Sequence, residues 1–488
     1  MTRRSLPPAR SSFHLGRVTI LCLWALLGLS SPVSASPEPT QPQLFTLPEA
    51  VQYAADHYPS VRAALARREA ARANVTLARD NYLPRADALW QTNRATRNNI
   101  AGVLLPQSTI PNPSGTVIDS STQSFWGTGA GLTITWEPFD FGYRRALVQS
   151  AQATTHRLDD QIALTLLDVD TAAADAALTV LATEQTAHAV QADIDRRTVL
   201  ARSVDALVNA HLRPGADSSR AHAELAAART QLIQAEQNSA LARASLAELL
   251  GVAGSEVEVA PGPLLQPPAQ PAIADIPAAQ HPLAIVDRDR VFEAQARVHV
   301  LNRSYVPRFD FVGTGYGRGS GAKGTGLPAK DPNQGLLPDT VNWATGINVR
   351  FATLDFFSIR SRTAVEQANQ RQQEQVLGQT IQTITGRTAR AKIRLEAARQ
   401  IAENTPIELQ ASHDAELQAR ARFQAGLATL VEVAEAQRLL VNAEIDDALA
   451  RLSIWRALER MAAAQGDLKP FLDQIHVAES QPATPGAH

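Results

Sequence analysis

The longest uninterrupted pattern in the chain runs from Tyr143 to Arg213, where neither glycine nor proline occurs. At about 1.5 Å per residue, one helix over this stretch would be roughly 105 Å long. Such an uninterrupted run indicates a coiled coil, a membrane span or a helical array. Charges recur every few positions, for example at Arg144, Arg157 and Asp168. These charges exclude a membrane helix, so the sequence predicts one long helix in an aqueous setting.

A second helix is predicted after Pro214-Gly215, from about Ser218 to Leu250. Its apolar and small residues recur at alternating spacings of three and four, as in helices that pack lengthwise on one another. Small side chains fill much of this seam, which lets a neighbouring helix approach closely. The seam consists of Leu225, Ala228, Leu232, Ala235, Ser239, Ala242, Leu246 and Leu249.

Strict alternation of apolar and polar residues predicts strands at two places in the first half of the chain. Residues 86–94 alternate, and so does the segment from Gly131, which Pro138 ends. The intervening residues 98–123 are rich in Asn, Pro, Ser, Thr and Gly and are predicted to form a long loop. In the second strand, one face carries Leu132, Ile134 and Trp136, and the other carries Thr133 and Thr135.

The chain then repeats itself. The Tyr-x-Pro-Arg sequence at 82–85 recurs at 305–308, and the Asp-Phe pair at 140–141 recurs at 355–356. Each half therefore has the order helix, strand, loop, strand, long helix, tight turn, helix. Matching Gly426 to Gly215 makes the second long helix four residues shorter than the first. Because Pro406 lies inside it, we expect a kink or a break there.

The repeat divides the chain into five parts. Residues 1–35 have arginines, then an apolar run, then Val33-Ser34-Ala35, which predicts a secretory signal peptide. The first repeat covers 36–251, a Pro-rich linker 252–280, and the second repeat 281–465, whose last helix starts at Thr429. Residues 466–488 are predicted to be a flexible tail. The single cysteine, Cys22, lies in the signal peptide, so the mature chain would have no disulfide.

The strands favour a membrane barrel over a soluble hairpin, because each pair has one apolar and one polar face. One chain supplies four strands, and an open sheet edge cannot lie in lipid. The chain must therefore oligomerise: two copies give eight strands and a filled interior, whereas three give twelve strands and a lumen. The shorter helices, stacked end to end, match the long helix in length. Three chains would thus place twelve helices around a tube.

These features together resemble the TolC-type outer-membrane efflux proteins. The resemblance rests on the two-fold repeat, the Tyr-x-Pro-Arg and Asp-Phe motifs, and the run from Gly426 to Gln437. It implies a fold that is mainly α with a membrane β-barrel: a homotrimer with a 12-stranded barrel in the outer membrane and a 12-helix α-barrel in the periplasm. The implied function is a passive exit duct of a tripartite efflux pump or type I secretion system. The implied partners are a periplasmic adaptor protein and an inner-membrane pump.

The resemblance also directs attention to the helical turns. It implies that the turns at Gly215 and Gly426 form a periplasmic tip, which closes the tube at rest and meets the adaptor. It places Glu432 and Glu435 in the lumen as gate carboxylates. The resemblance also implies a basic residue at position 428 and an acidic partner at position 221 that help to hold the tip closed, but this chain has Ala428 and Ala221 there. Three basic residues near the turns could form another closing contact: Arg213, Arg220 and Arg422.

No catalytic constellation, cofactor motif or metal-ligand motif stands out in the sequence, so we predict neither an enzyme nor a cofactor or metal site. The isolated histidines are interpreted as helix-surface residues. The net charge of −2 gives no support for nucleic-acid binding. The competing hypothesis is a soluble periplasmic coiled-coil adaptor or structural protein.

In three chains, Glu432 and Glu435 would form a ring of six gate carboxylates. Such a ring predicts a cation-preferring pore, and the crowding of like charges predicts raised carboxyl pKa values.

Overall fold

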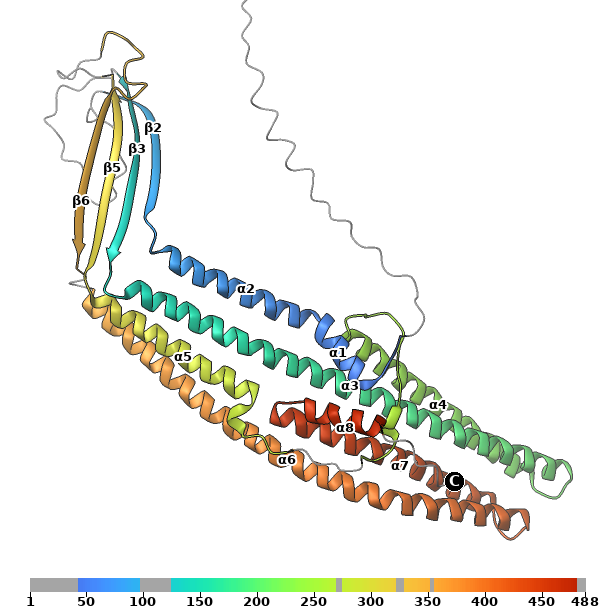
Figure 1. The fold of residues 1–488 in the computed structure, drawn as a ribbon. Coiled ribbons are helices and arrows are strands. Elements are labelled where there is room, and N and C mark those ends of the chain that lie inside the picture. Colours follow the sequence, from blue (N-terminus) through green and yellow to red (C-terminus); the bar gives the residue numbers. More distant parts are fainter. Residues whose placement is uncertain (1–42, 97–123, 269–273, 322–328, 352–354, 481–488) are drawn as a thin grey trace, which may run out of the picture.

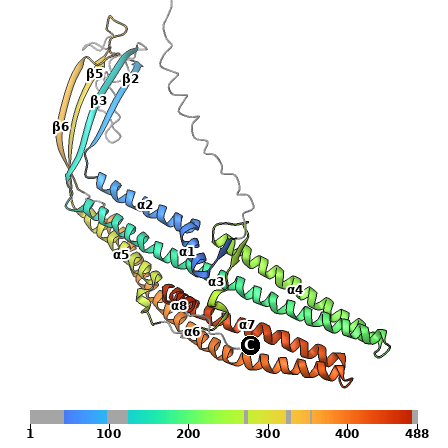
Figure 2. The same ribbon diagram turned by 45° about the vertical axis from the view of Figure 1, so that its right-hand side comes forward.

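The computed structural model describes residues 43–96, 124–268, 274–321, 329–351 and 355–480. The predicted signal peptide and the loop predicted at 98–123 lie outside the described residues. A four-stranded sheet stands at one end of the molecule, and long helices extend from it to two turns at the other end (Figures 1 and 2). Among the described helices, none is long and apolar enough to cross a membrane.

The order of elements confirms the predicted repeat. The first repeat contains α1 (Leu47–His57), α2 (Pro59–Asp80), β2 (Arg85–Thr96), β3 (Ser124–Phe139), α3 (Tyr143–Asn209) and α4 (Gly215–Leu249). The second contains α5 (Pro282–Asn302), β5 (Arg308–Ser320), β6 (Thr340–Arg350), α6 (Phe356–Gln424) and α7 (Leu430–Gln465).

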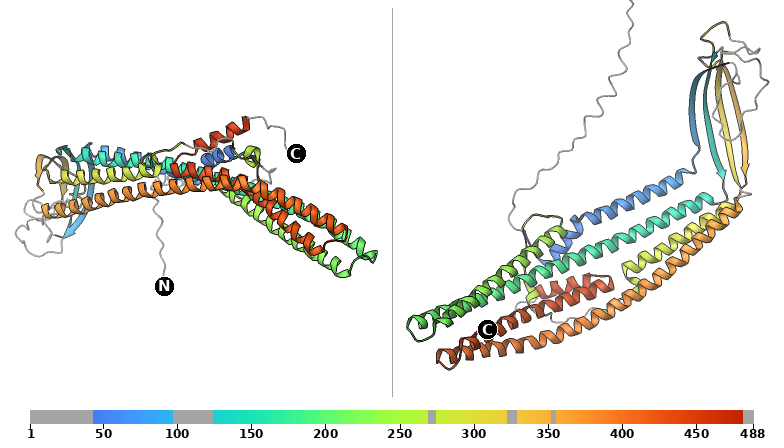
Figure 3. Two further views of the ribbon diagram at one scale, coloured as in Figure 1. Left: turned by 90° about the horizontal axis from the view of Figure 1, so that it is seen from below. Right: turned by 180° about the vertical axis from the view of Figure 1, so that it is seen from behind.

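In each repeat, shorter helices stack end to end along one long helix. In the first repeat, α2, α1 and α4 pack along α3; in the second, α5 and α7 pack along α6 (Figures 1 and 3). Contacts of α3 with α5 and α7 join the two repeats. The seam predicted for α4 packs on α3 within the first repeat, with Leu225, Ala228 and Leu246 buried. Each repeat therefore forms an elongated unit two helices wide, called a stave below, as the helix lengths predicted.

The sheet has the antiparallel order β2-β3-β5-β6. Its register puts Leu132 beside Ala88 and Gly315, so the alternation seen in the sequence continues across neighbouring strands. The strands are longer than predicted: β3 begins at Ser124, ahead of the predicted Gly131, and β5 continues to Ser320 through several glycines. Glycine-bearing strands are weak in sequence signal, but the pairing of β5 with β3 and β6 fixes them.

The recurring sequence motifs meet where the sheet joins the helices. Arg144 donates from Nε to Asp140 Oδ2 at 2.9 Å and from Nη1 to the Asn81 carbonyl oxygen at 3.0 Å. Its guanidinium lies 4.7 Å from the centre of the Tyr82 ring. Burial raises the pKa of Asp140, but hydrogen bonds from Arg144 and Gly142 outweigh it and lower that pKa overall. The Asp-Phe motif thus holds the start of α3 against the chain that leads into β2.

Pro406 does not break α6, contrary to the expectation from sequence. The helix is continuous from Phe356 to Gln424 and includes the proline (Figure 1). The neighbouring Thr405 donates to Asp447 Oδ1 of α7 at 3.2 Å, and both residues are buried. Packing along α7 therefore holds α6 together where proline removes a backbone hydrogen bond.

The chain around the middle of the staves is more ordered than predicted. In the Pro-rich segment, β4 (Val257–Val259) pairs in parallel with β1 (Gln43–Phe45). Short 3₁₀ turns occur in the same segment at Gly262–Leu265 and Ala278–Gln280. Another 3₁₀ turn joins α5 to β5 at Arg303–Tyr305.

Residues 466–488 were predicted to be a flexible tail, and this is wrong for α8 (Lys469–Ser480). Phe471 and Ile475 of α8 are buried, because the helix covers the core around Trp455.

Candidate functional site at the helical turns

Both long helices end with the same hydrogen-bond pattern. At the end of α3, the Leu212 N–H donates to the Leu207 carbonyl oxygen at 2.9 Å; at the end of α6, the Leu427 N–H donates to Arg422 O at 2.8 Å. This is the Schellman pattern, which requires a left-handed residue just before the donor. That residue is His211 (φ 59°) in the first turn and Gly426 (φ 74°) in the second.

The structure therefore corrects the matching of Gly215 to Gly426. Gly215 is the first residue of α4 and lies outside the left-handed region, with open space where a Cβ would be. The residue equivalent to Gly426 is His211, so the two long helices end in register. With 67 and 69 residues they are nearly equal, and the shortening predicted for the second is wrong. The error came from matching glycines, whereas the turn needs a conformation that histidine also adopts.

Arg213 joins the two turns. Its guanidinium carbon lies 4.6 Å from the centre of the Phe423 ring of α6. Its Nη2 donates to the Phe423 carbonyl oxygen at 3.3 Å. Because Arg213 belongs to the first repeat and Phe423 to the second, this cation–π and hydrogen-bond contact ties the repeats together at their far end.

An apolar cluster fills the space between the turns. It contains Ala221 and Ala428, the two positions where the resemblance implies a charged lock in the family, and both are buried. At these positions the chain packs apolar side chains. The cluster consists of Ile194, Ala201, Val204, Ala221, Leu225, Ala228, Phe423, Ala428, Leu430 and Val433.

Glu432 caps the last helix. Its Oε1 accepts from the Thr429 backbone N–H at 3.1 Å, while its own N–H donates to Thr429 Oγ1 at 3.4 Å. This reciprocal arrangement is a capping box, which satisfies free N–H groups at the start of α7. The backbone hydrogen bond from Thr429 lowers the pKa of Glu432. Arg422 lies nearby, with Nη1 3.8 Å from Glu432 Oε2, and donates from Nη2 to Leu427 O at 3.4 Å.

Glu435 lies one turn further along α7 and is paired with Arg438. The guanidinium donates from Nε to Oε2 at 3.0 Å and from Nη2 to Oε1 at 2.5 Å. The hydrogen bond from Arg438 lowers the pKa of Glu435. Within one chain, local partners thus lower both carboxyl pKa values, in the direction opposite to the crowding expected from the sequence. Both side chains are exposed, and their place in a lumen remains a prediction.

Other polar residues near the tip were missed by the sequence analysis. Ser218 donates to Asp205 Oδ1 at 2.6 Å, and His222 Nε2 lies 3.1 Å from Asp205 Oδ2, so these residues link α4 to α3. Arg196 donates to both carboxylate oxygens of Glu444, at 2.9 and 2.7 Å, and links α3 to α7. The pair of Glu435 with Arg438 could have been predicted from the sequence, because residues three apart lie on the same face of a helix. The contacts between helices could not, because they depend on how the helices are aligned along one another.

The comparisons with known proteins agree with this architecture. The family model described as outer membrane efflux protein matches residues 50–252 and 287–467, which is most of the chain and both repeats. The chain belongs to the outer membrane efflux protein family. It is an outer-membrane channel-tunnel protein for efflux or secretion that extends into the periplasm.

Individual relatives agree over nearly the whole length. Protein CyaE of Bordetella pertussis is 27% identical over 441 residues, which cover 85% of this chain and 83% of the relative. The Campylobacter jejuni outer membrane channel CmeC is similar in structure, with a TM-score of 0.68 at 15% identity and 89% of each chain covered. The Vibrio cholerae outer membrane protein VceC gives a TM-score of 0.66 at 16% identity, covering 86% of this chain and 96% of that one.

Proposed function

We propose that three copies of this chain close into one tube and act as a passive exit duct. The observation that carries the proposal is the sheet. It has one continuous apolar face that is exposed in the single chain, and its outer strands, β2 and β6, end the hydrogen-bond ladder. Lipid would cover the apolar face, and the neighbouring copies would cover the two edges.

The apolar face continues over the strands in register. Trp343 and Val341 of β6 leave 79% and 86% of their surface exposed, and the face continues through Ile347. Such large apolar side chains are unfavourable in water over so wide a patch. The opposite face carries polar residues, among them Asp310, Asn348 and the pair Thr133–Thr314, whose hydroxyl oxygens lie 3.2 Å apart. This alternation suits lipid outside and water inside.

The two open edges support closure of the sheet by neighbouring copies. Unsatisfied backbone groups cannot lie in the hydrocarbon region of a membrane, so β2 of one copy must pair with β6 of the next until the sheet closes. Two copies would give eight strands, which side chains fill. Three copies give twelve strands and leave a lumen, as a duct requires. A duct needs no catalytic residue, and we assign none to this chain.

At the other end, we propose that the turns around His211 and Gly426 form the periplasmic tip. There they would meet an adaptor protein and through it an inner-membrane pump. The exposed residues of the turns, with the contact of Arg213 on Phe423, offer a defined docking edge. Glu432 and Glu435 would line the constriction. Because Arg438 holds Glu435, we expect the field of the carboxylate ring to be weaker than six isolated charges would give.

Disulfide cross-linking tests the closure directly. The mature chain lacks cysteine if the predicted signal peptide is removed, so any disulfide that forms comes from the engineered cysteines. We suggest Gln91→Cys on β2, combined in turn with Asn342→Cys, Ala344→Cys and Asn348→Cys on the same face of β6. Oxidation in membranes should give a covalent ladder that ends at the trimer on a denaturing gel.

The matched control places the β2 cysteine on the other face, as Ala88→Cys, with the same β6 partners. Side chains on opposite faces of a sheet cannot form a disulfide, so these pairs should stay monomeric. If no Gln91 pair gives a ladder in correctly inserted protein, or if the ladder ends at the dimer, the three-copy closure is wrong.

A further inference from the structure

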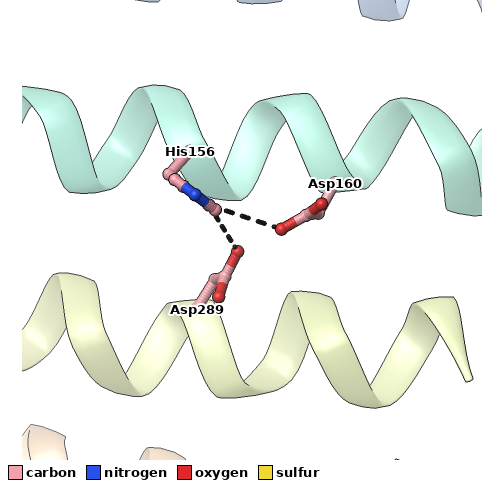
Figure 4. Close-up of side chains that lie close together, drawn as sticks. All are labelled: His156, Asp160 and Asp289. Carbon is pink, nitrogen blue, oxygen red and sulfur yellow. Dashed lines mark hydrogen bonds and ion pairs between the residues drawn. The ribbon is translucent and has the colours of Figure 1, made fainter. Parts of the chain in front are cut away.

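Three side chains of types that can ligate a metal ion converge where α3 of the first repeat passes α5 of the second. His156 and Asp160 lie one turn apart on α3, and Asp289 reaches them from α5 (Figure 4). His156 Nδ1 lies 3.4 Å from Asp160 Oδ2 and 3.3 Å from Asp289 Oδ2. The sequence predicts isolated histidines, because the contact of His156 with Asp289 depends on how the two repeats pack.

The acidic residue on α5 is unusual among its neighbours. Glu293, one turn along α5, is neutralised by Arg157, whose Nε donates to Oε2 at 2.7 Å, and accepts from Thr154 at 3.0 Å. Asp289 instead faces a histidine and a second carboxylate, although only 5% of its side chain is exposed. Arg288 lies on its far side, with Nε 3.7 Å from Oδ1. Asp160, with 33% of its side chain exposed, converges on the buried Asp289, and two converging carboxylates are stabilised when a cation lies between them.

The spacing of the ligand atoms fits a small divalent metal ion. In a tetrahedral zinc site the metal–ligand bonds are about 2.0–2.2 Å, so neighbouring ligand atoms lie roughly 3.3–3.6 Å apart by simple geometry. The two distances from His156 Nδ1 fall in this range. All three ligand atoms lie within 4.8 Å of one another, so small side-chain movements would complete the site.

We propose that His156, Asp160 and Asp289 bind one Zn²⁺ or similar first-row divalent ion per chain. An imidazole nitrogen with two carboxylate oxygens favours such an ion over Mg²⁺ or Ca²⁺, which prefer oxygen ligands alone. The side chain of His156 is 76% exposed, so the ion can enter from solvent and keep water in its fourth position. The bound ion would join the two repeats in the half of the helical tube that lies nearer the sheet.

Metal titration tests this proposal on the full mature chain, without a polyhistidine tag and in detergent. Calorimetry with Zn²⁺ should show one site per chain, and Co²⁺ should give the intense visible absorption of a four-coordinate complex. His156→Ala and Asp289→Asn should each weaken Zn²⁺ binding at least tenfold and abolish the Co²⁺ band. Because His156 is exposed, its replacement leaves packing intact.

His413→Ala is the matched control, since His413 Nδ1 lies 3.9 Å from a single carboxylate oxygen, that of Asp414. This variant should bind Zn²⁺ as the original chain does. Zn²⁺ should also raise the unfolding temperature of the original chain and of the control, but not of His156→Ala. The proposal is overturned if the original chain binds no Zn²⁺, or if His156→Ala and the control bind it equally.

Discussion

The two turns at the tip have the same backbone and different residues, which shows what the repeat conserves. Both close with a Schellman pattern, and both put the following helix against the same apolar cluster. The first uses His211 in the left-handed position and Pro214, without a side-chain cap, before α4. The second uses Gly426 and the capping box of Thr429 and Glu432. Hydrogen bonding and burial define the turn, and several residue types satisfy them.

The turns also differ in what they contribute to each other. The position of Arg213 corresponds to that of Ala428, two residues after the left-handed residue. Arg213 reaches out to Phe423 of the second repeat, whereas Ala428 is buried in the cluster. At these equivalent positions the first turn therefore provides a polar contact to the other repeat, and the second provides a buried methyl group. The tip is asymmetric within each chain, although the chain is built from a repeat.

The largest effect should come from a β-branched residue in the left-handed position. Gly426→Val should destabilise the second turn by on the order of 1–3 kcal/mol, because valine tolerates positive φ poorly. Gly215→Val should change little, since Gly215 is helical and its Cβ would point into open space. Hydrogen exchange of the turn amides measures both. Equal loss of protection in the two variants would show that the turns are not related as described.

A reciprocal exchange sharpens the comparison. A left-handed conformation costs a non-glycine residue roughly 1–2 kcal/mol, and the greater freedom of glycine in the unfolded chain offsets about 0.5–1 kcal/mol of this. His211→Gly should therefore stabilise the first turn slightly, and Gly426→His should destabilise the second by a similar amount. Exchange rates at the ends of α3 and α6 should move in opposite directions. Changes of the same sign would contradict the equivalence of these positions.

The contact between the turns should have a smaller effect. Arg213→Ala removes a cation–π contact worth about 0.5–1 kcal/mol near a surface, together with one hydrogen bond. A double-mutant cycle with Phe423→Leu separates the pair from the loss of packing in the apolar cluster. A coupling energy near zero would mean that Arg213 and Phe423 do not act together.

The smallest effect concerns acid. The pKa of Glu432 is lowered by its bond to Thr429, so its contribution to stability is present above the ordinary carboxyl pKa and is lost as pH falls through the lowered value. The start of α7 should therefore loosen in acid, and Glu432→Gln should remove most of that pH dependence. Amide protection at Glu432 and the next residues, followed from neutral to acid pH, provides the measurement. An unchanged pH profile in the variant would exclude the capping role.

Patterns along the chain were sufficient for the staves but not for the tip. The seam from Leu225 to Leu249, the strand alternation and the two recurring motifs predicted the repeat, because helix packing and strand alternation have a regular period. Features that depend on the partner surface were predicted wrongly or missed. Pro406 is held in α6 by α7, and α8 was missed although Phe471 and Ile475 have helical spacing. Ala221 and Ala428 could be seen as departures from the family, but their burial in one cluster depends on how the helices of the two repeats pack.

The central claim is that this chain forms a water-filled duct whose narrow end lies at these turns. Single-channel recording in a planar bilayer tests it, with purified protein inserted in one orientation. We expect discrete conductance steps, preference for cations, and block by polyvalent cations from the side of the turns. Replacing both carboxylates, Glu432→Ala with Glu435→Ala, should weaken selectivity and block in an assembled trimer, whereas Arg438→Ala should strengthen them. An inserted trimer that gives no conductance steps would rule out the duct, and selectivity and block that none of these variants change would rule out a narrow end at these turns.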